Sequence, residues 1–282
     1  MKTKYFPYIF ISPFFIIFGV FMAYPLSDSL RLSTYAARGM EDLNFVGLGN
    51  FERLLADPVF WVALWNTVYF ALGSLLLQLP IALFLALLLS KSNLRGRNWF
   101  RLIFFFPVLI SGVFIAILFY VIYDRRYGLV NEFLGREISW LQDPDLVMPA
   151  IILAGVWRWA GFNMIYFIAG LQSIRKELYE AAAIDGAGPW QTFRYITIPA
   201  LKPVLAFVVI TSVIGSFQLF DLPYVLTEGG PGNASITIVM YLYRHGFEFI
   251  NLGYASTIGW VLAVIIGLVS IFQVRYFGLF KE

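Results

Sequence analysis

The stretch from Pro58 to Ser90 reads PVFWVALWNTVYFALGSLLLQLPIALFLALLLS, 33 residues without a charged side chain. An α-helix rises about 1.5 Å per residue, so about 20 apolar residues cross a hydrocarbon core of roughly 30 Å. This stretch is long enough to span a membrane with residues to spare. We expect its outer part, with Trp61 and Trp65, to lie among the lipid headgroups.

The composition of the whole chain agrees with a membrane location. Hydrophobic residues make up 60% of the 282 residues and charged residues 13%, against about 45–50% and about 25% in soluble domains. The net charge of +3 comes from basic residues that form no continuous stripe, so we expect no nucleic-acid partner. The chain has no cysteine and one histidine, His245. These counts exclude disulfides and thiolate or multi-histidine metal sites, and we expect no cofactor.

Six apolar runs reach spanning length, which predicts an all-α membrane protein with six transmembrane helices. The fourth run is interrupted only by Arg158 and the fifth only by Asp221. The first run is longer than the roughly 7–15 apolar residues of a cleaved signal peptide, so we expect an uncleaved helix there. The predicted spans are Tyr5–Ser27, Pro58–Ser90, Leu102–Tyr123, Leu146–Ile174, Pro203–Thr227 and Phe249–Val274.

The basic residues between the spans predict the orientation. If the amino terminus is cytoplasmic, twelve of the 20 Lys and Arg residues lie on the inner side and seven on the outer side. The short segment Lys91–Arg101 holds four cations and no acid, which strongly favours a cytoplasmic location. We therefore predict a single membrane domain, residues 1–282, with both termini in the cytoplasm. The outer segment Asp28–Asp57 is polar and is predicted to fold as a small extracytoplasmic element.

The inner loop between spans four and five, residues 175–203, is too polar to enter lipid. Its first part, RKELYEAAAI, contains good helix formers, with Leu178, Ala181 and Ala182 on one stripe. A Gly-Ala-Gly sequence beginning at Gly186 then predicts a break, because glycine adopts positive φ without a Cβ clash.

A second short helix is expected after this break. Pro189 suits the first position of a helix, and Pro199 and Pro203 are expected to end the segment where span five begins. Three apolar side chains face one way along it: Trp190, Phe193 and Ile196. From the residues alone, two interpretations stay open. The two helices either pack beneath their own bundle or present small residues for another protein to dock.

The loop carries a pattern of ten fixed positions, E-A-A-x-x-D-G-A followed by F-x-x-I-x-x-P-x-x-x-P. It resembles the signature loop of ABC importer permeases, and Gly186 lies 96 residues from the carboxyl end, as in that family. Segments around Val46–Phe51, Trp157–Ile174 and Phe220–Pro231 resemble the carbohydrate-uptake branch. The positions are Glu180, Ala181, Ala182, Asp185, Gly186, Ala187, Phe193, Ile196, Pro199 and Pro203.

The resemblance implies a type I permease fold and a sugar-importing function in the bacterial inner membrane. Residues 175–203 would form a cytoplasmic coupling loop that sits in a groove of an ATPase subunit, with Glu180 pairing a basic group and Gly186 making the bend. The implied partners are a second homologous permease, two ATPase subunits, an extracytoplasmic solute-binding protein, the sugar and membrane lipid. No G-x-x-x-x-G-K-[ST] phosphate loop occurs in the sequence, so the chain itself is not expected to be an enzyme. The implied ATPase-coupling residues are Glu180, Ala181, Ala182, Asp185, Gly186 and Ala187.

Arg158 lies 12 residues into the fourth predicted span. A charge at that depth costs about 2.5 kcal/mol or more, so it should face the bundle interior or a water-filled cavity. Asp221 is the obvious ionic partner, but its predicted depth differs by about 9 Å, so direct pairing would need a long reach. Both a structural role and a role in the pathway or its gating stay open for Arg158.

A sugar pathway combines aromatic faces with amide and carboxylate groups. Because aromatic residues make up 19% of the chain, most of them are expected to face lipid or pack between helices. The candidate pathway residues are Trp157, Arg158, Trp159, Asn163, Phe217, Gln218 and Asp221.

Two other classes of protein are weighed against the importer. An ion-coupled secondary transporter would need carboxylates within the spans, and only Asp221 offers one. A membrane-embedded enzyme would need a nucleophile–base pair or a metal-ligand cluster, and neither occurs in the sequence.

Overall fold

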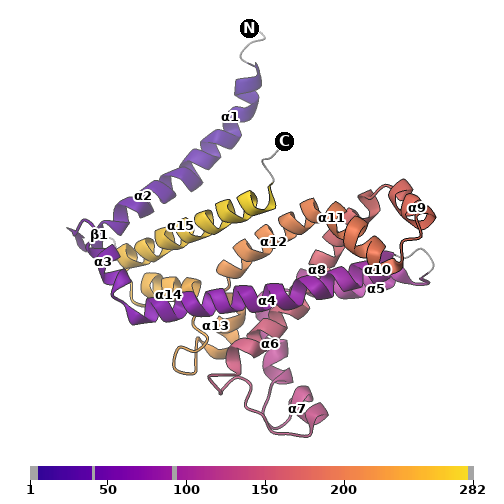
Figure 1. Ribbon diagram of the computed structural model, residues 1–282. Helices are drawn as coiled ribbons and strands as arrows, with labels where there is room; N and C mark the ends of the chain where they lie inside the picture. The colour runs from indigo at the N-terminus through magenta and orange to yellow at the C-terminus, as the bar shows by residue number, and fades with distance from the viewer. Residues whose placement is uncertain (1–5, 40–41, 91–93, 279–282) are drawn as a thin grey trace. The chain divides into compact units, whose positions relative to one another are not determined.

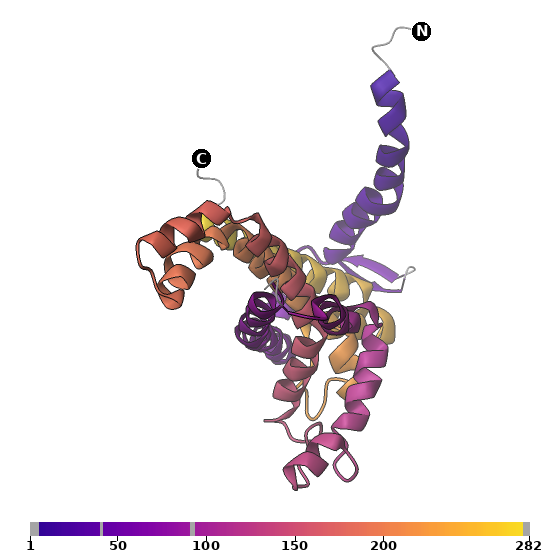
Figure 2. The same ribbon diagram turned by 90° about the vertical axis from the view of Figure 1, so that its right-hand side faces the viewer.

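A computed structural model describes residues 6–39, 42–90 and 94–278 (Figures 1 and 2). The chain divides into two compact units. Unit 1 comprises residues 1–60 and 241–264, and unit 2 comprises residues 61–240 and 265–282. Of the cations counted for the orientation, four lie outside the described residues: Lys2, Lys4, Lys91 and Lys281.

Four helices of the described chain are long and apolar enough to cross a membrane, or up to six segments if each of two bent helix pairs forms one span. The four correspond to the first, second, fourth and sixth predicted runs. The first combines α1 (Phe6–Phe18), the π-helix η2 (Gly19–Ala23) and α2 (Tyr24–Ser33). The other three are α4 (Pro58–Ser90), α8 (Val147–Ser173) and α15 (Leu252–Phe277).

The third predicted run is not one straight helix. Helix α5 (Arg97–Phe105) leads through the 3-10 turn η3 (Phe106–Leu109) into α6 (Gly112–Ile122), with a bend of 101°. Ile110 and Ser111 have extended ψ angles of 138° and 140°, so the helical backbone is interrupted between η3 and α6. An average over hydropathy does not detect such a change of direction.

The fifth predicted run is also broken. Helix α12 (Lys202–Phe217) is bent by 64° from the helical segment before it, and α13 (Asp221–Thr227) is a separate short helix. The preceding segment ends at Ala200, one residue after Pro199, close to the predicted end. Pro199 lies in the first turn of α11 (Ile198–Ala200), where a missing N–H is tolerated. Pro203 lies in the first turn of α12, which begins one residue before the predicted start of the fifth run.

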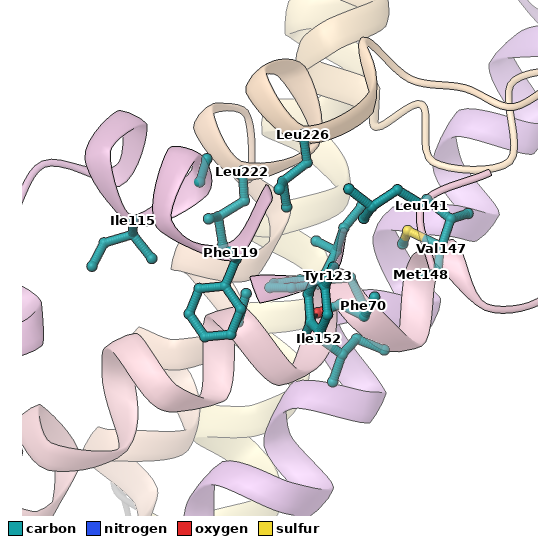
Figure 3. Packing of buried hydrophobic residues seen from close by; sticks show 14 of the residues in the cluster. Phe70, Ile115, Phe119, Tyr123, Leu141, Val147, Met148, Ile152, Leu222 and Leu226 are labelled. Atoms are coloured by element: carbon teal, nitrogen blue, oxygen red, sulfur yellow. Dashed lines mark hydrogen bonds between the residues drawn. The ribbon is translucent and has the colours of Figure 1, made fainter. Parts of the chain in front are cut away.

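Helix α8 is the most buried of the candidate spans and packs against α5, α6, α12 and α13. Small residues allow this close packing. A Cβ on Gly161 would lie 1.7 Å from the carbonyl oxygen of Phe104, and one on Gly73 would lie 2.6 Å from a methyl group of Ile152. Figure 3 shows the apolar cluster where the first half of α8 meets α6 and α13. Its large members include Phe70, Ile115, Phe119, Tyr123, Leu141, Val147, Met148, Ile152, Leu222 and Leu226.

Unit 1 is built on a two-stranded antiparallel hairpin. Strand β1 (Tyr35–Arg38) pairs with β2 (Asp42–Phe45), and α3 (Gly49–Leu55) follows. The buried Asn50 amide donates to the carbonyl oxygens of Ser33 and Tyr35, which holds α3 against the end of α2. The predicted small element of residues 28–57 consists of the end of α2, this hairpin and α3. Helix α14 (Ile238–Tyr243) and the π-helix η5 (Arg244–Glu248) lead into α15.

Candidate transport site and coupling surface

A cleft lined by both polar and apolar residues lies between three helices of unit 2. Its volume is about 130 Å³, and it is bounded by α4, α8, α12 and the residue Leu219. Aromatic side chains form part of the wall, namely Phe70, Trp159 and Phe162. The polar residues that line it are Ser74, Gln78, Asn163, Thr211, Ser212 and Ser216.

The polar lining consists of neutral hydroxyl and amide groups held by hydrogen bonds between helices. The Asn163 amide donates to the Ser212 hydroxyl over 3.2 Å, and the hydroxyls of Ser74 and Ser216 lie 3.4 Å apart. Asn163, Ser74 and Ser216 are buried. Such groups inside an apolar bundle are costly unless they hydrogen-bond. The arrangement suits a neutral solute that carries many hydroxyl groups.

Among the predicted pathway residues, the structure places Asn163 and Trp159 in this cleft. Trp157 instead packs edge-on against Phe119, with ring centroids 5.6 Å apart. Phe217 is buried and Gln218 is exposed where α12 ends, and neither lines the cleft.

The sequence reasoning missed the serines, threonine and glutamine of the lining. A signal for them existed in the spacing. Ser74 and Gln78 are four residues apart, as are Ser212 and Ser216, so each pair lies on one face of its helix. Two polar stripes within otherwise apolar runs indicate faces that turn away from lipid.

Arg158 and Asp221 form a direct ion pair in unit 2. Nη1 of Arg158 lies 2.7 Å from Oδ2 of Asp221, and the side chains are 14% and 33% exposed. The other carboxylate oxygen, Oδ1, accepts the backbone N–H of Leu222 at 3.0 Å. The expected 9 Å difference in depth does not prevent the pair. Asp221 opens the separate helix α13, so its position along the fifth run does not measure its depth.

Gly112 makes room for this ion pair. It is the first residue of α6, directly after the 101° bend. A Cβ at this position would lie 1.4 Å from Oδ2 of Asp221 and 2.5 Å from Nη1 of Arg158. Any other residue at position 112 would therefore displace one or both charged groups.

The predicted coupling loop consists of two short helices joined at Gly186. Helix α9 (Lys176–Ile184) is followed by α10 (Pro189–Thr192), the π-helix η4 (Phe193–Thr197) and α11. The backbone N–H of Ala187 donates to the carbonyl of Ala182, and that of Gly186 to the carbonyl of Ala183. These two bonds form a Schellman motif. It requires the positive φ of Gly186, which is +75°.

The bend at Gly186 faces open space. A Cβ on Gly186 would meet nothing of this chain within 4 Å, so packing within the chain does not explain the glycine there. Glu180 and Asp185 are exposed, and so are the apolar side chains of Ile184 and Trp190. Ala182 is buried. The loop thus presents acidic and apolar groups on the surface of the chain.

Helix α9 is nonetheless held in place. The hydroxyl of Tyr179 lies 3.2 Å from that of the buried Thr197, which joins α9 to η4. The rings of Trp190 and Phe193 lie 5.7 Å apart, as expected for residues on one helix face. The outer surface of α9 is therefore a fixed shape rather than a flexible tether.

Unit 1 contains a different polar cluster around Asp57. Its Oδ1 accepts the backbone N–H of Val59 at 2.9 Å, at the start of α4. Its Oδ2 accepts the hydroxyls of Tyr241 and Tyr254, the latter at 2.8 Å. The guanidinium of Arg53 lies 4.3 Å from the centre of the Tyr254 ring. Arg53 thus joins α3 to α15, and Asp57 joins the start of α4 to α14 and α15.

Asp57 and His245 titrate abnormally in this cluster. Burial raises the pKa of Asp57. The hydrogen bonds from the two tyrosines and from Val59 together lower it by more than burial raises it, so the pKa lies below its ordinary value. Burial, together with the nearby Arg53 cation, lowers the pKa of His245. At neutral pH the cluster therefore contains a carboxylate and a neutral imidazole.

The fold and the cleft define a class: a multi-pass helical membrane protein with a cleft, lined in part by polar groups, between its helices. Comparison with known proteins identifies the family. The family model described as "Binding-protein-dependent transport system inner membrane component" matches residues 78–279. The chain is similar to the lactose transport system permease protein of Rhizobium radiobacter, with 42% identity over 94% of this chain and 92% of the relative. It is also similar to the arabinooligosaccharides transport system permease protein of Bacillus subtilis, with 38% identity over 98% and 89%.

A solved structure agrees with these relatives. A chain of a bacterial ABC transporter involved in the import of the acidic polysaccharide alginate superposes with a TM-score of 0.86 and 26% identity, covering 100% of this chain and 98% of that one. The protein belongs to the family of binding-protein-dependent transport system inner membrane components. The predicted membership in the ABC importer permeases is confirmed, and the chain is a transport subunit rather than an enzyme.

Proposed function

We propose that this chain is the permease subunit of an ATP-driven, binding-protein-dependent sugar importer in the bacterial inner membrane. It provides half of the translocation path, together with a second homologous permease. Two ATPase subunits drive it from the cytoplasm, and an extracytoplasmic solute-binding protein delivers the sugar. The chain acts as one membrane domain of six spans with both termini in the cytoplasm. The bent pair of α5 and α6 is the third span, and α12 with α13 forms the fifth, after the cytoplasmic coupling loop.

The cleft between α4, α8 and α12 is the main observation in favour of a sugar as the substrate. Its hydroxyl and amide groups can exchange hydrogen bonds with sugar hydroxyls, and Trp159 and Phe162 can cover the apolar faces of a sugar ring. Among the described residues that line the cleft, none is charged. The relatives named for lactose and for arabinooligosaccharides support the same class.

The surface around Gly186 supports coupling to an ATPase. It has a fixed shape, an acidic residue at Glu180 and a bend that leaves room for a close-approaching partner. We propose that Glu180, Ala181, Ala182, Asp185, Gly186 and Ala187 transmit the ATPase movement to the bundle.

The ion pair argues against an ion-coupled mechanism. A coupling carboxylate must bind and release its ion during each cycle. Asp221 is held by Arg158 on one oxygen and by a backbone N–H on the other. We assign the pair to holding α13 against α8.

The coupling role is tested with Glu180→Ala combined with Gly186→Leu. We expect membrane insertion to persist, sugar uptake to collapse, and the ATPase subunits to copurify poorly. Glu177→Ala is the matched control, because Glu177 is an exposed acid on the same helix with only a weak 3.4 Å contact to Arg175. Normal uptake by the double variant would reject the docking role.

The substrate class is tested in proteoliposomes of the assembled complex by asking which sugars stimulate ATP hydrolysis. Asn163→Ala and Ser212→Ala should raise the KM for sugar uptake roughly tenfold, because each removes a lining group. Ser173→Ala is the matched control, since Ser173 ends α8 outside the cleft and its hydroxyl donates to the carbonyl of Gly170 within the same helix. If Asn163→Ala and Ser212→Ala had the same KM as the control Ser173→Ala, the cleft would not be part of the sugar pathway.

A further inference from the structure

The segment between α6 and α8 exposes large apolar side chains outside any candidate span. Helix α7 (Leu129–Leu134) lies in this segment. Phe133 is 90% exposed and Tyr127 is 85% exposed. Beside them is a cleft of about 450 Å³ whose walls include Arg125, Arg126 and Arg136. Arginine and aromatic residues are the types that dominate the binding energy of protein interfaces.

The backbone that presents these side chains is fixed by polar contacts. The buried amide of Asn131 donates to the carbonyls of Arg125 and Ile138, at 3.0 and 2.8 Å, and its oxygen accepts the indole N–H of Trp140 at 2.8 Å. The carboxylate of Asp124 accepts two backbone N–H groups of the turn, those of Arg126 and Tyr127. Such preorganisation lowers the entropy lost when a partner binds.

The charges of the cleft favour a protein partner over an anionic lipid or polysaccharide. Two carboxylates, Glu132 and Glu137, lie among the three arginines. Arg125 and Glu137 approach to 3.9 Å with both side chains mostly exposed, which is a weak contact. Among the described residues, Arg126 and Arg136 make no ion pair. A uniformly anionic surface would be repelled by the two glutamates, whereas a protein surface can present both signs of charge.

The position of this segment fits the outer side of the membrane. It precedes α8 and the coupling loop follows α8, a helix of 27 residues that is about 40 Å long. Figures 1 and 2 show α7 and α9 at opposite ends of α8. If the coupling loop is cytoplasmic, as the proposed function requires, α7 lies outside.

From this arrangement we infer that Arg125, Arg126, Tyr127, Phe133 and Arg136 form the docking surface for the extracytoplasmic solute-binding protein. The complementary face of the binding protein presents carboxylates to the arginines around an apolar socket for Phe133. This inference rests on the proposed function and assigns one of its partners to a surface.

The test uses the assembled transporter in nanodiscs, with its purified binding protein titrated in and ATP hydrolysis measured. Phe133→Ala should raise the half-maximal concentration of binding protein about tenfold, and basal hydrolysis should stay unchanged. Arg126→Ala combined with Arg136→Ala should raise it similarly and weaken its dependence on salt. Phe114→Ala is the matched control, an exposed aromatic side chain within α6, and should leave the titration unchanged.

The outcomes separate this inference from the proposed function. A wild-type complex that the binding protein stimulates, with variants that titrate like wild type, would overturn the docking surface alone. A wild-type complex that no binding protein stimulates would overturn both. A defect that follows the anionic lipid content of the nanodisc, at every concentration of binding protein, would assign the surface to lipid instead.

Discussion

Two carboxylates of this protein lie at the starts of helices, and they are stabilised in opposite ways. Asp221, at the start of α13, faces the guanidinium of Arg158 in unit 2. Asp57, one residue before α4, receives two tyrosine hydroxyls and a backbone N–H in unit 1. One negative charge is balanced by a positive charge, and the other is solvated by neutral donors.

This difference determines how each cluster responds to change. Removing one partner from an ion pair within a membrane leaves an uncompensated charge, which is costly. Removing one donor from a solvated carboxylate leaves the other donors in place. The ion pair is therefore expected to fail abruptly, and the cluster around Asp57 to weaken in steps.

The largest expected effect is that of Asp221→Ala. It leaves Arg158 without its charged partner and should destabilise the protein by about 3–5 kcal/mol. The double variant Arg158→Leu with Asp221→Leu should regain most of this loss, because no charge remains. Thermal unfolding of the purified protein measures both. A double variant as unstable as the single one would contradict this account of the pair.

Gly112→Ala should come next, at about 1–3 kcal/mol, because its Cβ overlaps the ion pair. The same change made together with Asp221→Ala should add little, since the overlapping carboxylate is gone. The difference between the stability lost in wild type and the stability lost in Asp221→Ala measures the overlap of the new Cβ with the Asp221 carboxylate. Equal losses in both would indicate that the glycine serves the backbone instead.

Asp57→Asn should give a smaller loss that depends on pH. The pKa of Asp57 is lower in the folded protein than in the unfolded chain, so its contribution is present above the unfolded value of about 3.9 and is lost as pH falls through the folded value. Wild-type protein should therefore lose hydrogen-exchange protection in α3 and α14 at acid pH. The variant should have a flatter profile, and an unchanged profile would exclude Asp57 as the titrating group.

The smallest effects are expected for Tyr241→Phe and Tyr254→Phe, about 1 kcal/mol each. Each removes one hydroxyl donor from Asp57, and Phe at 254 keeps a ring beneath Arg53. Because both hydroxyls bond the same oxygen, the double variant should lose more than the sum. Unfolding of the two single variants and the double variant forms the cycle that tests this coupling.

Much of the architecture could be predicted from hydropathy and turn chemistry. The boundaries of Pro58–Ser90 agree with α4, and those of the fourth run differ from α8 by one residue at each end. The bend at Gly186 and the helix start at Pro189 were also predictable, since glycine and proline act through local backbone geometry. The 101° bend between α5 and α6 was not, because the third predicted run is uncharged on both sides of it.

The residues that line the cleft were predictable only in part. Asn163 stands out as an amide in an apolar run. Serine is a frequent residue in membrane helices, so Ser212 and Ser216 do not stand out by residue type. Asp221 was predictable as the ionic partner of Arg158, but the expected difference in depth was wrong, because depth was measured along a helix that is in fact interrupted at Gln218–Phe220.

The sequence by itself determined that this chain spans a membrane, and it placed the bend that presents the coupling surface. Hydrophobic length and the φ preference of glycine are local properties, so they can be read without a fold. Only the tertiary structure decided which polar side chains share a cleft and which charges meet. Those contacts join residues as distant as Arg158 and Asp221, and the broken helices that bring them together are set by packing around α8.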